Sequence, residues 1–161
     1  MDLRKSGLMP RGYQQMMKVR ILWVGRTKEN YLIEGINYYL KLLKNTINLK
    51  IMEIKGEKGK DRPKTLSEEG KRILRQTNSY VLLDEKGVEM STKQFASFLS
   101  RRDSVDFVIG GHFGVSDEVR KNSSLVLAIS KMTLTHEMTR LILLEQLYRS
   151  VTIIKGMEYH Y

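Results

Sequence analysis

The chain contains no cysteine, only two prolines and one tryptophan, and no long hydrophobic run. The absence of cysteine excludes disulfide bonds and thiolate metal sites. No apolar stretch approaches the ~20 residues that a membrane helix needs, and the N-terminus lacks an uninterrupted hydrophobic segment of signal-peptide length. We therefore expect a cytoplasmic protein with no membrane partner and no bound metal.

The size and composition are those of one globular domain. The chain has 161 residues, of which 41% are hydrophobic and 29% are charged. Lysine and arginine number 28 against 18 acidic residues, which gives a net charge of +10. This excess favours a polyanionic partner through phosphate contacts and counterion release, although a solvated surface would carry the same charge. We expect nucleic acid to be that partner.

The first fifteen residues show no hydrophobic periodicity, and they precede the pair Met16-Met17. We interpret residues 1–16 as a leader or an added extension outside the fold, with residues 17–161 as a single domain. No internal repeat or low-complexity segment interrupts that domain.

Short apolar segments alternate with segments of helical periodicity along the domain. The predicted strands span residues 18–24, 47–54, 80–83, 105–109 and 125–129. The predicted helices begin at Asn30, Ser67, Ser91, Ser116 and Thr135, the first of them burying Ile33, Ile36, Leu40 and Leu43. This alternation predicts an α/β fold whose mostly parallel sheet is covered by helices on both faces.

Three predicted strands end in segments that could hold a ligand. They lead into Asp84, into Gly110-Gly111 and into Ser130-Lys131-Met132. Ligands of open α/β sheets bind beyond the carboxyl ends of the strands, and paired glycines let the backbone approach them closely. A tight turn without a ligand would also use two glycines. The spacing fits neither a P-loop nor the dinucleotide fingerprint, so those nucleotide sites are excluded.

The helix from Thr135 to about Ser150 is apolar almost all round, which predicts burial in the core or at a subunit interface. His136 and Arg140 lie one turn apart near the strand ends, where a functional role is favoured. Glu145 and Arg149 have the spacing of a structural ion pair. The terminal Tyr159-His160 would be either frayed or folded back to hold a base.

Several motifs in the second half of the chain occur together, and their joint spacing is more specific than any one of them. They are Phe107-Val108-Ile109-Gly110-Gly111-x-x-Gly114, Ser130-Lys131-Met132-Thr133-x-x-His136-x-x-x-Arg140, Glu145-Gln146-x-Tyr148-Arg149 and Gly156-x-x-Tyr159-His160. In this respect the chain resembles the ribosomal RNA large subunit methyltransferase H family of the SPOUT superfamily.

The resemblance implies a fold and an activity that composition and periodicity do not show. The fold would be a SPOUT-type α/β knot, with the C-terminal part of the chain threaded as a trefoil knot. The protein would be a homodimer that uses S-adenosyl-L-methionine to methylate N3 of a pseudouridine in large-subunit ribosomal RNA. It would act on the assembled ribosome, and DNA would not be a partner.

The resemblance also implies roles for individual residues. The cofactor would be held by Leu83, Gly110, Gly111, Ile129, Ser130, Lys131, Met132, Thr133 and Leu134. RNA placement and catalysis would fall to His136, Arg140, Tyr148, Arg149, Tyr159 and His160, with either histidine as the proton acceptor. The last long helix would pack across the dimer and bring one subunit's tail to the other's cofactor.

Two positions depart from the family pattern, because Thr135 stands where a proline is common and Glu158 precedes the final Tyr-His pair. Two alternative functions stay open at this point. One is a non-catalytic ribosomal RNA-binding or assembly factor, and the other is a SPOUT methyltransferase that acts on another RNA, such as transfer RNA.

Overall fold

The computed structural model describes residues 16–159, so the predicted leader lies almost wholly outside the described residues. Its centre is a five-stranded sheet in the order β2-β1-β4-β3-β5, and every strand pair is parallel. The strands are β1 (Lys18–Val24), β2 (Asn48–Ile54), β3 (Val81–Glu89), β4 (Ser104–Ile109) and β5 (Leu125–Ala128). The predicted parallel α/β sheet is confirmed.

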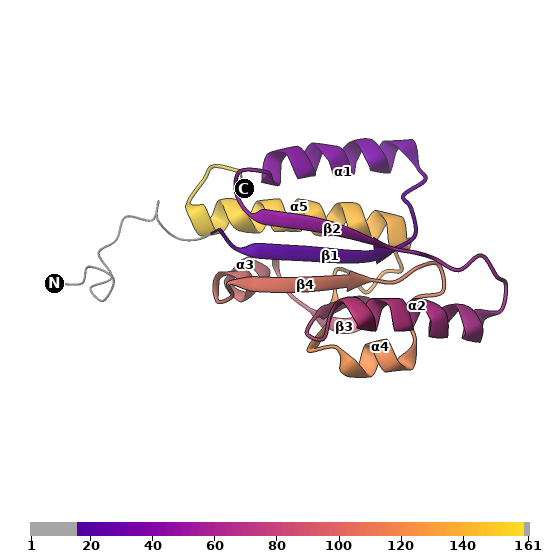
Figure 1. Cartoon of the computed structure of the whole chain (residues 1–161). Coiled ribbons are helices and arrows are strands. Elements are labelled where there is room, and N and C mark those ends of the chain that lie inside the picture. Colours follow the sequence, from indigo (N-terminus) through magenta and orange to yellow (C-terminus); the bar gives the residue numbers. More distant parts are fainter. Residues whose placement is uncertain (1–15, 160–161) are drawn as a thin grey trace.

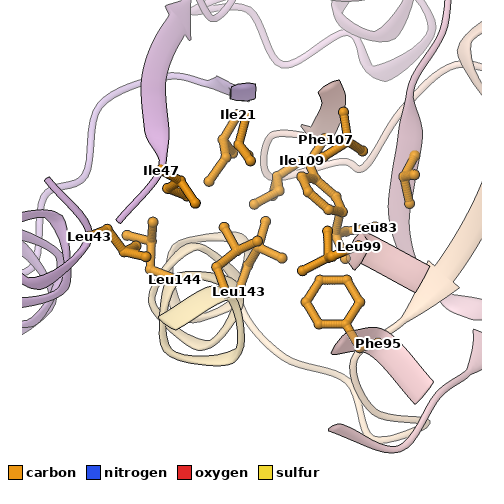
Figure 2. Close-up of a cluster of buried hydrophobic side chains, with 14 of the residues drawn as sticks. Ile21, Leu43, Ile47, Leu83, Phe95, Leu99, Phe107, Ile109, Leu143 and Leu144 are labelled. Carbon is orange, nitrogen blue, oxygen red and sulfur yellow. The ribbon is translucent and has the colours of Figure 1, made fainter. Parts of the chain in front are cut away.

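Helices cover both faces of the sheet (Figure 1). They are α1 (Asn30–Leu43), α2 (Arg62–Gln76), α3 (Thr92–Ser100), α4 (Asp117–Asn122) and α5 (His136–Lys155). The larger core lies between the sheet and α1, α3 and α5, where Leu143 and Leu144 of α5 meet strand residues such as Ile21 and Ile109 (Figure 2). A smaller core lies between the opposite face and α2 and α4.

Strand β1 contributes to both cores, which explains its nearly continuous apolar sequence. Ile21 and Trp23 face the larger core, whereas Leu22 and Val24 face the smaller one. Alternate residues of a strand point to opposite faces, so a strand in the middle of a covered sheet must be apolar on both.

One predicted helix start and one predicted N-cap are wrong. Helix α2 begins at Arg62 rather than Ser67, because Asp61 caps it by accepting from the Lys64 amide at 3.2 Å and Pro63 fits the first turn. The charged loop between β2 and α2 therefore spans residues 55–61. Helix α1 begins at Asn30 as predicted, but Asn30 is its first helical residue and the N-cap position is Glu29 rather than Asn30.

The predicted buried face of α1 is also partly wrong. Leu32 is in the core and Ile33 is 36% exposed. Residues 32, 36 and 43 share one face of a helix as well as residues 33, 36 and 40 do, so periodicity alone could not choose between them. The capping box of Ser91 and Gln94 and the Ser116 cap are confirmed.

Strand β3 does not end at Leu83 as predicted. It continues to Glu89 after an irregularity, since Leu83 and Val88 both pair with Leu127 of β5. Gly87 lies so close to β5 that a Cβ added there would be 2.5 Å from the Val126 carbonyl oxygen. Residues 84–87 therefore form a bulge beside β5 instead of a terminal turn.

Helix α5 is longer than predicted, reaching Lys155 before Gly156 ends it with a φ of 67°. Within residues 16–159, no helix has both the length and the apolar character needed to cross a membrane.

Candidate functional site: a cleft at the carboxyl ends of the strands

A cleft of about 1350 Å³ lies beyond the carboxyl ends of β3, β4 and β5. The N-terminal ends of α2, α4 and α5 close its sides. Such a position is the usual ligand site of an open parallel sheet, because the loops that leave neighbouring strands meet there. Of the nine residues that the resemblance assigned to a cofactor, eight line this cleft: Leu83, Gly110, Gly111, Ile129, Ser130, Met132, Thr133 and Leu134.

The loop after β4 forms one wall of the cleft. Gly114 donates its amide to the Gly111 carbonyl at 3.0 Å and has a φ of 81°, which makes a tight turn. A Cβ added at Gly110 would lie 2.5 Å from the Gly114 carbonyl oxygen, so only glycine fits there. Gly110 and Gly114 therefore build a tight turn, and both line the cleft.

The loop after β5 forms the opposite wall. The Ser130 hydroxyl accepts from the Met132 amide at 3.0 Å, and the Met132 side chain is 78% exposed. Lys131 is the one assigned residue that does not line the cleft, since its amine lies 3.9 Å from Glu89. An exposed thioether at the rim of a cleft could fold onto a flat ligand without losing packing elsewhere.

His136 is the first residue of α5, which is capped by Thr135 through a bond from the Met138 amide at 3.1 Å. Its ring faces the cleft, with its centroid 6.5 Å from that of His112. Burial, assisted by the charge of Arg140, lowers the pKa of His136 below 6.5. The imidazole is therefore neutral at pH 7 and can accept a proton.

Arg140 lies beneath the cleft, and its side chain is fully buried. It donates to the Val24 carbonyl at 2.6 Å and to the Thr27 hydroxyl at 2.8 Å, and it lies over the Trp23 ring. Burial lowers the pKa of Arg140 to about 10, so it stays charged at neutral pH. The guanidinium holds the carboxyl end of β1 and does not face the cleft, so it is not placed to touch RNA in this arrangement.

The lining of the cleft is acidic, although the protein as a whole is strongly basic. Its charged side chains include one close pair, in which Arg120 donates to Asp84 at 2.6 Å. Burial opposes ionisation of Asp84, but the hydrogen bonds from Arg120 and the Lys86 amide hold its pKa below the usual value. Three cations, Arg62, Lys86 and Arg120, face six carboxylates, those of Glu29, Asp84, Glu85, Asp117, Glu118 and Glu137.

Most of these carboxylates are not apparent as a group in the sequence, because they belong to different segments that only the fold brings together. Glu137 shows how they are placed: its carboxylate accepts from the Lys28 and Glu29 amides and so joins α5 to the start of α1. The sequence gives one indication of them, because acidic residues follow directly after the N-cap residues of α4 and α5.

A second group of predicted residues lies at the other end of α5. The predicted ion pair is confirmed, with Arg149 donating to Glu145 at 2.9 Å. The Arg149 guanidinium also lies over the ring of Tyr159, which packs edge-on against Tyr148. Arg149 follows His136 by 13 positions along α5, which is ~20 Å at 1.5 Å per residue. His160 lies outside the described residues.

Comparison with known proteins agrees with the fold and the motifs. The family described as "Predicted SPOUT methyltransferase" matches residues 17–160. The Ribosomal RNA large subunit methyltransferase H of Thermodesulfovibrio yellowstonii is 42% identical over 147 residues, 91% of this chain and 100% of that protein. The protein of the same name from Geobacter sulfurreducens is 39% identical over 153 residues, 90% of this chain and 100% of its own length.

A solved structure described as that of a hypothetical protein has a TM-score of 0.51 at 11% identity, and the match covers 91% of this chain and 72% of the other. That likeness concerns the fold alone. The family match covers nearly all of the described residues, and the sequence relatives match over their whole length. The chain therefore belongs to the SPOUT methyltransferase family.

Proposed function

We propose that this protein transfers a methyl group from S-adenosyl-L-methionine to N3 of a pseudouridine in large-subunit ribosomal RNA, within the assembled ribosome in the cytoplasm. The observation that carries the proposal is the convergence of eight assigned residues on one cleft. Membership of a methyltransferase family supports the reaction, and the names of the relatives support the substrate.

The cleft has the chemistry that this cofactor requires. The lack of a side chain at Gly110 lets the Gly114 backbone fold closely against it, and this tight loop lines the cleft where backbone groups could contact an adenosine. The apolar side chains of Leu83 and Leu134 offer surface for the base, and the surplus of carboxylates favours a cationic sulfonium over an anion. When bound, the cofactor would supply an electrophilic methyl group, and the protein has to orient both partners and exclude water.

Methylation at N3 requires that the N3 proton be removed. His136 faces the cleft as a neutral imidazole, so we propose it as one proton acceptor, with His160 as the other candidate. Substitution distinguishes them: the variant that loses the acceptor should lose turnover by 10²-fold or more, roughly the range for general acid–base groups, with unchanged cofactor affinity.

We also propose that the active site is completed by a second copy of the chain. Within one chain, the group containing Arg149 and Tyr159 lies ~20 Å along α5 from His136, too far to share a substrate base. A homodimer that packs through α5 would bring one chain's tail to the other chain's cleft. We propose that the C-terminal part is threaded as the trefoil knot that the family membership implies.

Subunit complementation tests the dimer proposal. His136→Ala and His160→Ala should each impair the site, one by loss of the proton acceptor and the other by loss of a contact to the substrate base. Their co-expressed mixture should recover about a quarter of wild-type activity, because half of the dimers would contain one intact composite site. If both residues serve the same chain's site, the mixture stays impaired.

The reaction itself is tested by calorimetry and mass spectrometry. The protein should bind S-adenosyl-L-methionine and add one methyl group to ribosomes from cells that lack the modification. Absence of cofactor binding at saturating protein would contradict the proposed methyltransferase activity. Cofactor binding with methylation of transfer RNA alone would show a different substrate, and RNA binding without any methylation would indicate an assembly factor.

A further inference from the structure

A second cavity, of about 990 Å³, lies at the amino-terminal edge of the sheet, opposite the cleft. It is bordered by the first residues of the strands, by the C-terminal end of α2 and by the segment that follows α3. We call it the amino-edge groove. Its charged lining residues are Lys18, Arg20, Lys50, Arg75, Arg102 and Asp106.

The groove exists because helix α2 ends before it covers the first residues of β1 and β2. Arg20 pairs in register with Lys50 of β2 on one side and with Asp106 of β4 on the other. Residues in register point to the same face of a sheet, here the face covered further along by α2. At its last turn α2 adds Arg75, so cations from two strands and a helix meet at one uncovered corner.

The single carboxylate in the groove is already neutralised. Asp106 accepts from the Arg20 guanidinium at 2.9 Å and from the Thr77 hydroxyl at 2.7 Å. Among residues 16–159, Lys18, Lys50 and Arg75 form no ion pair, and all three side chains are exposed. The groove therefore presents a net positive charge to whatever enters it.

Arg102 adds a guanidinium whose position is fixed. It donates to the Phe98 carbonyl at 2.8 Å and lies 3.5 Å from the centre of the Phe98 ring. An arginine held in this way loses little conformational freedom when it binds an anion. Short polar side chains that also contact phosphates in protein–nucleic acid complexes complete the lining: Asn48, Asn78, Ser79, Ser104 and Ser124.

The two cavities have opposite charge. Carboxylates outnumber cations two to one around the cleft, whereas cations outnumber the carboxylate five to one around the amino-edge groove. An RNA backbone near the cleft would meet repulsion, so its binding energy has to come from phosphate contacts elsewhere on the surface. The strands from β2 to β5 span roughly 19 Å at 4.8 Å per strand, enough for several phosphates.

We propose that the amino-edge groove binds the phosphate backbone of RNA at a distance from the nucleotide that reacts. That the bound RNA is ribosomal RNA rests on the proposed function. The groove would position the substrate without reading its sequence, since phosphate contacts carry no sequence information. Its role is separate from cofactor binding, which takes place at the opposite edge of the sheet.

A pair of charge-matched variants tests the groove. The groove variant combines Lys18→Gln, Lys50→Gln and Arg75→Gln, and leaves the paired Arg20 and the stacked Arg102 intact. The control variant removes three exposed lysines that form no ion pair within residues 16–159 and do not line the groove: Lys44→Gln, Lys93→Gln and Lys121→Gln. Both variants lose the same net charge.

The measurement is the affinity for purified large ribosomal subunits from about 50 to 200 mM salt. The groove variant should bind ~10-fold or more weakly, and its slope of log affinity against log salt should fall by about 3, one unit for each phosphate that it no longer neutralises. The control should lose less than ~3-fold in affinity. Equal losses in the two variants would overturn the proposal.

Two further measurements test the groove even if the proposed methyl transfer is not observed. The groove variant should bind S-adenosyl-L-methionine like the wild type; if the wild type binds none, the proposed function fails but the difference in RNA binding still decides the groove. A photo-crosslinker at Asn78, in the groove, should label ribosomal RNA, whereas one at Lys121 should not. Labelling of a ribosomal protein from Asn78 would overturn the proposal even if the triple variant misfolds.

Discussion

Gly111 lies against the carboxylate of Glu69: a Cβ added at Gly111 would be 3.3 Å from Glu69 Oε2. The other oxygen of that carboxylate accepts from the Glu57 amide at 3.0 Å. Glu69 is only 6% exposed, and no residue among 16–159 forms an ion pair with it. This one side chain thus connects the charged loop after β2 with the glycine loop of the cleft.

We predict that Glu69→Gln stabilises the protein at neutral pH. Burial raises the pKa of Glu69 above 4.5, so the folded state binds this proton more tightly than the unfolded chain does. The stability that Glu69 contributes is therefore present below pH 4.5 and lost as the pH rises through the folded pKa. Urea unfolding should show the advantage of Glu69→Gln at pH 7 and its loss in acid.

The matched variant Glu69→Ala should instead be destabilised by about 1 kcal/mol or more, because the Glu57 amide loses its acceptor. If glutamine and alanine gave the same unfolding free energy, the hydrogen bond to the loop would contribute nothing.

The two glycines of the cleft should respond differently to alanine. At Gly110 the added Cβ would be 2.5 Å from the backbone oxygen of Gly114, whereas at Gly111 it meets only the side chains of Val24 and Glu69, at 3.2 and 3.3 Å. Gly110→Ala should therefore distort the loop, cost about 1–3 kcal/mol in stability and weaken binding of S-adenosyl-L-methionine ~10-fold or more. Gly111→Ala should cost less than about 1 kcal/mol. Calorimetry and urea unfolding compare the two; equal effects would mean that the backbone clash is relieved by movement.

The position of the cleft could be predicted from the sequence because it depends on a general rule. Apolar strands that end in glycine or polar residues identify the carboxyl edge of a parallel sheet. This rule alone predicts that Gly110 and Ser130 lie at that edge, and both line the cleft. The start of α2 could not be found as safely, because Ser67-Glu68-Glu69 is as good a capping signal as Asp61, and only the structure shows which one is used.

The charge of the cleft and the buried position of Arg140 could not be predicted from the sequence. Asp84 and Glu137 are 53 positions apart, and their proximity depends on the sheet order rather than on any local pattern. Likewise, the helical repeat of α5 places His136 and Arg140 at one end, but it does not say that the guanidinium turns inward to Val24. Such contacts follow from packing between segments that are far apart in the sequence.

We predict that His136 makes the folded protein less stable as the pH falls below 6.5. Burial is the main cause that lowers the pKa of the His136 imidazole below 6.5, and the charge of Arg140 is the second. Below pH 6.5 the unfolded chain therefore binds more protons than the folded one. The stability contributed by His136 is complete above pH 6.5 and is lost as the pH falls through the folded pKa. Urea unfolding of the wild type and of His136→Gln between about pH 5 and pH 7.5 should show a smaller decline in the variant. Superimposable curves would contradict this.

Substitution of Arg140 distinguishes a structural role of this side chain from a direct role in RNA binding. Its guanidinium is buried, and it satisfies the Val24 carbonyl and the Thr27 hydroxyl. Arg140→Ala should therefore cost about 3 kcal/mol in unfolding free energy, because the variant lacks two charge-assisted hydrogen bonds and leaves a buried carbonyl without a partner. Thr27→Val removes only one of these hydrogen bonds and should cost about 1 kcal/mol.

Trp23, the single tryptophan of the chain, lies against Arg140, so its fluorescence reports directly on this contact during urea unfolding. A shift of the folded-state emission in Arg140→Ala, together with the loss of stability, would show that the guanidinium holds the end of β1 in place. If Arg140→Ala instead unfolded like the wild type and lost only RNA methylation, the side chain would have to leave its buried position during the reaction and contact the RNA itself, as the family resemblance implies.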